Sequence, residues 1–129
     1  MFRLKFAPGL LLGLLLTTSP GFAHHSFAAQ YEAKNRFTMT GTIAKIDWIN
    51  PHSYIYLDVK DDSGKTTQWS REGYPPNTLI RTGIKRALLK VGDKVTIEGC
   101  KARDGENVGA GRELTLTDGT KVFWGPSGQ

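Results

Sequence analysis

Cysteine is almost absent from this chain of 129 residues, and its one thiol, Cys100, has no second cysteine with which to pair. An internal disulfide is therefore excluded, and stability must come from packing. The chain also lacks a serine in a glycine elbow, a glycine-rich phosphate loop and any sequence neighbour that marks Cys100 as an activated nucleophile. We therefore predict a protein that is not an enzyme.

A strong excess of one charge is also missing. The chain has 17 lysines and arginines against 12 acidic residues, a formal charge of +5. Arg3 and Lys5 lie in the amino-terminal leader, so only +3 remains beyond it, with both signs interspersed. Such a balance is typical of a solvated surface, and nucleic acid is not expected as a partner.

The leader has the three parts of a secretory signal. Arg3 and Lys5 form a basic start, an apolar run extends from Phe6 to Leu16, and Gly21-Phe22-Ala23 supplies small residues for cleavage after Ala23. The apolar run is interrupted by Pro8 and is shorter than the roughly 20 residues that span a bilayer. We expect a periplasmic or secreted protein with no stable membrane insertion after cleavage.

Cleavage would leave 106 residues, enough for one domain. The predicted organisation is a signal peptide over residues 1–23, a flexible lead over 24–36 and a β-domain over 37–129. Short runs of β-branched and aromatic residues separated by turn signals dominate that domain, and helical periodicity is nearly absent.

The first predicted strand, Phe37 to Trp48, changes its apolar face partway along. A period of two forbids this change unless a residue is inserted, so we expect a bulge at Ala44-Lys45. Ser53 to Val59 and Thr66 to Ser70 are predicted to form a hairpin through the Asp61–Gly64 turn.

A short helix follows, capped by Asn77 and ended by Gly83. The turn Val91-Gly92-Asp93 leads to a strand with Val95 and Ile97 inward, and Asp118-Gly119 joins strands over 112–117 and 121–124. The pattern predicts an all-β, OB-like barrel of five or six strands, with one short helix between strands three and four. An open antiparallel sandwich or roll is the alternative.

Several motifs resemble those of a family of small exported bacterial proteins known only as a domain of unknown function. They are Ala23-His24-His25-Ser26-Phe27, Trp48-Ile49-Asn50-Pro51-His52 and Leu89-Lys90-Val91-Gly92-Asp93-Lys94-Val95. The resemblance covers nearly all of the chain after the leader. It implies export and a single small β-domain, and it implies no activity or catalytic residue.

The three histidines suggest a metal site. Cleavage after Ala23 would leave His24 with a free amine, which can chelate together with its own ring, and one more imidazole from His52 would complete a three-nitrogen set. Such sites suit Cu(II). His25 could bind instead through its ring and the preceding backbone nitrogen, and zinc held by three imidazoles is a further alternative. The contrary hypothesis is an inert chain end, with His52 capping a turn.

A second hypothesis needs no metal. Trp48, Tyr54 and Tyr56 could form an aromatic face that binds a small molecule, a glycan or a partner peptide. The cations that could rim an anionic ligand there are Arg71, Arg81, Lys85 and Arg86. The alternative is that Trp48 and Trp69 belong to the core and the tyrosines merely cover the sheet. The two functional expectations are thus an exported Cu(II)-binding protein and an exported protein that binds an unknown small ligand or periplasmic protein.

Overall fold

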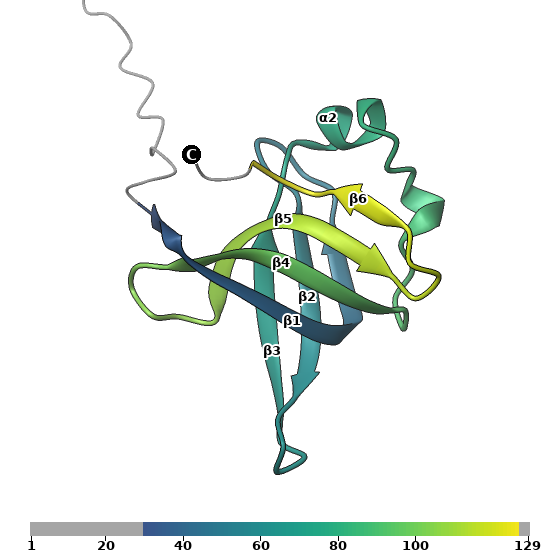
Figure 1. Cartoon of the computed structure of the whole chain (residues 1–129). Coiled ribbons are helices and arrows are strands. Elements are labelled where there is room, and N and C mark those ends of the chain that lie inside the picture. Colours follow the sequence, from purple (N-terminus) through teal and green to yellow (C-terminus); the bar gives the residue numbers. More distant parts are fainter. Residues whose placement is uncertain (1–29, 127–129) are drawn as a thin grey trace, which may run out of the picture.

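The computed structural model describes residues 30–126, which form six strands, a short helix and one 3₁₀ turn. The elements lie in the order strand, strand, strand, helix, 3₁₀ turn and three further strands (Figure 1). Their bounds are β1 Tyr31–Asp47, β2 Tyr54–Lys60, β3 Thr66–Glu72, α2 Pro76–Arg81, η1 Arg86–Leu88, β4 Lys94–Ala102, β5 Val108–Leu116 and β6 Lys121–Phe123.

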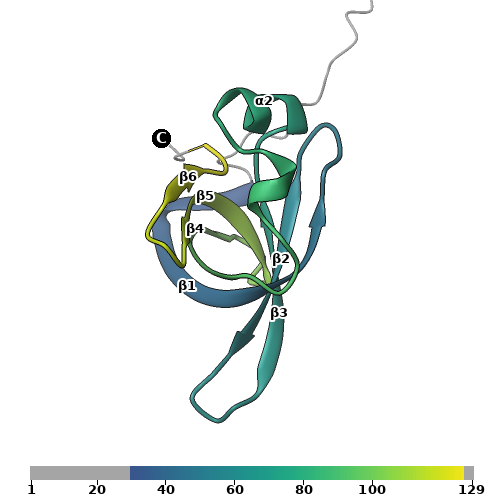
Figure 2. The same cartoon turned by 90° about the vertical axis from the view of Figure 1, so that its right-hand side faces the viewer.

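The sheet closes into a barrel. Its antiparallel order is β3-β2-β1-β4-β5-β6, and a parallel pairing between β3 and β5 joins the two sides. Five strands therefore form the closed barrel, and β6 is an extra strand paired with β5. Figure 2 shows β1 curving around the barrel, with α2 above it. The predicted OB-like barrel, with its helix between strands three and four, is confirmed, and the open sandwich is wrong.

Strand β1 pairs with β2 on one side and β4 on the other. Its register with β2 shifts between Ile43 and Lys45, which confirms the bulge predicted there. β1 begins at Tyr31, so residues 31–36, expected in the flexible lead, belong to the sheet. Burial explains this start, because Tyr31 packs with Cys100 and Ala110 in a small second cluster.

The main core follows the expected alternation along the strands. Ile43, Ile55 and Leu57 are fully buried from one half of the barrel, and Ile97 and Leu114 are buried from the other. Beyond β6, Trp124 is also fully buried, and it continues the alternation in which Val122 is partly buried and Phe123 is exposed. The main apolar core thus lies inside the barrel.

The helix begins differently from the prediction. Pro75 occupies the position before α2, no side chain caps the helix, and Asn77 lies within the first turn. Pro76 accounts for the earlier start. An amide hydrogen at the first helical position has no partner within the helix, so proline, which lacks this hydrogen, loses nothing there, and its φ is already helical. Gly83 follows the helix with a φ of 99°, in agreement with its expected role.

Strand β5 also begins earlier than the predicted Arg112. Residues Val108, Gly109 and Ala110 pair in parallel with Ser70, Arg71 and Glu72 of β3. Glycine is required at Gly109, because a Cβ there would lie 2.6 Å from the carbonyl oxygen of Cys100. The pairing that closes the barrel is therefore made by a segment whose composition predicts a loop.

Candidate functional site

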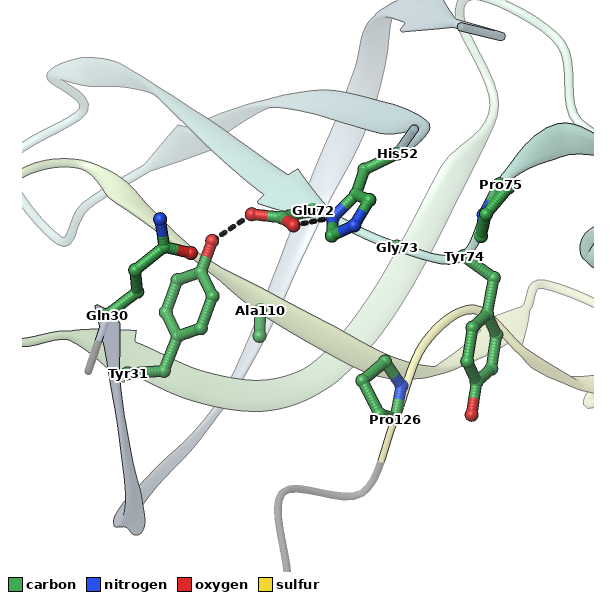
Figure 3. Close-up of a pocket in the computed structure, with 9 residues that line it drawn as sticks. All are labelled: Gln30, Tyr31, His52, Glu72, Gly73, Tyr74, Pro75, Ala110 and Pro126. Atoms are coloured by element: carbon green, nitrogen blue, oxygen red, sulfur yellow. Dashed lines mark hydrogen bonds and ion pairs between the residues drawn. The ribbon is translucent and has the colours of Figure 1, made fainter. Parts of the chain in front are cut away.

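A pocket of about 220 Å³ lies where the end of β3 meets the start of β1 (Figure 3). Its walls are largely apolar or aromatic, and the polar ends of Tyr31, His52 and Glu72 lie together on one side. The lining residues are Gln30, Tyr31, His52, Glu72, Gly73, Tyr74, Pro75, Ala110 and Pro126. A concave, mainly apolar site with a few convergent polar groups is the usual form of a ligand site.

The backbone around Ser53 brings His52 to this pocket. The Gly73 amide donates to the Ser53 carbonyl oxygen at 2.8 Å, and the Ser53 amide donates to the Tyr74 carbonyl oxygen at 3.2 Å. These bonds extend the β2–β3 pairing beyond its last ladder pair, Tyr54 with Glu72. The β1–β2 loop is thereby held against the end of β3, so that the His52 side chain lies beside the Glu72 carboxylate.

Three polar side chains form a connected chain on the polar side of the pocket. The Tyr31 hydroxyl donates to Oε2 of Glu72, and Nδ1 of His52 contacts Oε1 of the same carboxylate (Figure 3). The Glu72 side chain is only 13% exposed, whereas that of His52 is 47% exposed. Burial, reinforced by the neighbouring Tyr54, raises the pKa of Tyr31 to about 12. Tyr31 is therefore a neutral donor to Glu72 at ordinary pH.

This arrangement determines the chemistry available to His52. An ionised carboxylate can only accept hydrogen bonds, so Nδ1 of the neutral imidazole must carry the proton. The second ring nitrogen, Nε2, then keeps its lone pair for a metal ion or a hydrogen-bond donor. Metal-binding histidines are commonly oriented by such a carboxylate. Within residues 30–126, however, no group of three or more histidine, cysteine or acidic side chains could hold an ion by itself.

The other predicted metal ligands, His24 and His25, lie outside the described residues. The described chain begins at Gln30, whose side chain lines the same pocket as His52 (Figure 3). The first of the described residues thus lies at the pocket.

The predicted aromatic face is assembled only in part. Tyr54 and Tyr56 share one face of β2, both partly buried. The Lys45 ammonium lies 5.1 Å from the ring centroid of Tyr56. Trp48 packs against the core, where its ring lies edge-on to that of Trp124 with the two ring centroids 6.1 Å apart. Trp48 is therefore partly buried against the core, and its part in a binding face with the two tyrosines stays a prediction.

Arg71 requires a correction. Its side chain is fully buried, so it cannot form the outer rim of an anionic ligand. The guanidinium lies 4.1 Å from the Phe37 ring centroid and 4.8 Å from that of Trp69, and it donates to the Ser70 carbonyl oxygen at 3.0 Å. The reason is strand parity, since Arg71 is two residues from the inward Trp69. Period-two counting puts Arg71 on the same face of β3 as Trp69, but only the closed sheet shows that this face is the inner one.

Sequence reasoning missed Tyr31, Glu72 and Tyr74 as site residues. Tyr31 stands in a polar stretch that was expected to be a flexible lead, and Glu72 ends a strand of ordinary surface composition. Only the isolated aromatic ring of Tyr31 offered a local signal. The carboxylate and its partners come from β1, the β1–β2 loop and β3, and no local pattern predicts their meeting.

Over the described residues, the fold and the pocket define a small β-barrel with a histidine–carboxylate pair at one end. A comparison with protein-family models matches residues 13–112 to a family of unknown function, DUF6152, and the chain belongs to this family. Searches of the curated proteins and of the solved structures found no significant match. Among the described residues, no helix has the length and apolar character needed to cross a membrane.

Proposed function

We propose that this is an exported protein whose mature form binds Cu(II) between His52 and an amino terminus created by cleavage after Ala23. The observation that supports it most directly is the pairing of His52 Nδ1 with Glu72. That pairing leaves Nε2 as the metal-binding nitrogen and orients the half-exposed ring at the pocket.

The length of chain before the barrel is compatible with this site. Six residue steps separate His24 from Gln30, which lines the pocket. An extended chain covers about 3.5 Å per residue, so the segment can reach roughly 20 Å. The His24 amine and ring would supply two nitrogens and His52 the third, with the His25 ring as the alternative. Such a nitrogen-rich set favours Cu(II) among divalent ions.

The deciding experiment is a Cu(II) titration of protein that begins at His24, in competition with a chelator of known affinity. His52→Ala removes one ligand, and one added glycine before His24 removes the chelating terminal amine. Glu72→Gln keeps an acceptor for Nδ1 without the charge, and it should weaken binding about 10-fold to 100-fold. Circular dichroism verifies that each variant is folded.

The proposal fails if the protein binds Cu(II) no more tightly than a free peptide of residues 24–29. It also fails if His52→Ala leaves the affinity unchanged in a folded protein. Mass spectrometry of exported material tests the maturation step, since any first residue other than His24 removes the terminal chelate.

A second candidate function is the binding of a small organic ligand without metal. The apolar walls formed by Tyr74, Pro75 and Pro126 favour it, together with a volume that accommodates a single-ring molecule. Tyr74→Ala should abolish such binding, and a chelator should leave it unaffected. Titration of glycans, peptides and small aromatic compounds, followed by tyrosine fluorescence, separates this function from copper binding.

A further inference from the structure

The connection from α2 to β4 carries a concentration of positive charge that the overall composition conceals. Between residues 73 and 92 there are four cations and no acidic residue. The cations are Arg81, Lys85, Arg86 and Lys90. Outside this stretch, acidic residues slightly outnumber basic ones once the leader is set aside. The positive excess of the mature chain is therefore located in one segment.

The same segment exposes apolar side chains that the core does not use. Leu79, Ile84 and Leu89 are buried and attach the segment to the barrel. Ile80 is 51% exposed, Leu88 37% and Val91 69%. We call residues 80–91 the basic–apolar segment. Exposed apolar side chains and exposed cations are interspersed along this segment.

The basic–apolar segment lies along one side of the molecule. In Figure 1 the chain passes from α2 down the right-hand side through η1 to β4, and in Figure 2 that side faces the viewer. Within residues 30–126, none of its four cations forms an ion pair, whereas Lys45 and Lys121 pair with Asp47 and Glu113 at 2.9 Å. The Arg86 guanidinium lies 5.2 Å from the Trp48 ring centroid, which fixes it beside the barrel.

We propose that the basic–apolar segment attaches the protein peripherally to an anionic phospholipid surface. The cations match the negative headgroups, and the exposed isoleucine, leucine and valine side chains suit the apolar boundary beneath them. Nucleic acid or a soluble acidic partner would use the cations but would gain little from the three apolar groups. This inference is independent of copper binding at the pocket.

Vesicle co-sedimentation of the full mature chain tests this surface. The vesicles contain phosphatidylcholine alone or with 30% phosphatidylglycerol as a chosen probe. The charge variant Arg81→Gln/Lys85→Gln/Lys90→Gln should lower partitioning onto anionic vesicles about 100-fold. The matched control Lys34→Gln/Lys65→Gln/Lys101→Gln removes three exposed cations elsewhere and should change partitioning by less than about 5-fold.

A second variant tests the apolar contribution. Ile80→Ser/Leu88→Ser/Val91→Ser should lower partitioning roughly 10-fold or more, because it removes the side chains that enter the lipid boundary. Urea denaturation verifies that each variant is folded.

Three results would overturn the proposal. They are the failure of the wild type to bind anionic vesicles, an equal loss in the matched control, and undiminished binding by the apolar variant. The last result would identify a site for a soluble polyanion instead.

Discussion

Replacing Arg71 with methionine should change the free energy of unfolding by no more than about 1 kcal/mol, although the arginine is fully buried. Burial lowers the pKa of Arg71 to about 10. This shift corresponds to a penalty of about 3 kcal/mol for holding the charge inside the barrel at neutral pH. Methionine removes that penalty and retains most of the side chain's length.

The stabilising interactions that Arg71→Met removes are of similar size to this penalty. The Arg71 guanidinium lies 4.1 Å from the Phe37 ring centroid and 4.8 Å from that of Trp69. Each desolvated cation–π contact contributes about 1 to 2 kcal/mol. The bond to the Ser70 carbonyl contributes about 1 kcal/mol, while Nε has no hydrogen-bond partner in the described structure. Gains and losses therefore nearly cancel. Arg71→Ala, by contrast, should cost about 3 kcal/mol through the cavity it leaves.

Urea denaturation of the wild type and both variants at pH 7 measures these differences. A loss of 3 kcal/mol or more in Arg71→Met would refute the reasoning, because the charge itself would then be stabilising. A second arm uses pH. The folded guanidinium loses its proton first, so the unfolded chain binds more protons above pH 10. Wild-type stability should therefore rise with pH relative to Arg71→Met in that range.

Three further perturbations follow from the structure. The pKa of Tyr31 is raised to about 12, so the contribution of this tyrosine to stability should be lost as the pH rises from 10 towards 12; the wild type should lose stability relative to Tyr31→Phe, as seen in urea midpoints across this range. Gly99→Ala should lower stability by about 2 kcal/mol or more in thermal melts, because a Cβ would overlap the Ala110 carbonyl oxygen; a loss below 0.5 kcal/mol, on the order of a neutral surface change, would contradict this. Hydrogen bonds from Ser63 and Lys65 lower the pKa of Asp61, so its contribution to stability should be present at neutral pH and lost in acid, and Asp61→Asn should remove that acid dependence.

Local patterns were sufficient where a strand has one buried face and a turn has a definite chemistry. The change of apolar face between Ile43 and Ile46 predicted the bulge, because side chains in a strand alternate strictly. The Asp61–Gly64 turn predicted the β2–β3 hairpin, and Gly64 adopts the positive φ of 84° that such a turn requires. These features depend on neighbours within a few residues, so they could be predicted without the rest of the molecule.

The site could not be predicted in the same way. The Glu72 carboxylate contacts His52, which is 20 residues away in the sequence, and Tyr31, which is 41 residues away. Their meeting depends on barrel closure, which in turn depends on the parallel pairing of β3 with a glycine-rich segment. Arg71 was assigned to the surface by its charge, and the interior position follows from its parity on a strand whose inner face is set by the closed sheet.

By itself, the sequence determined an all-β barrel of five or six strands, with its bulge, its main hairpins and its intervening helix, because the alternation of apolar and polar residues is a local property of each strand. Only the tertiary structure decided that His52 faces a carboxylate held by Tyr31, that Arg71 is enclosed, and that the unpaired cations lie along one side. The physical reason is that burial and charge pairing are set by distances across the barrel, and residues far apart along the chain determine them.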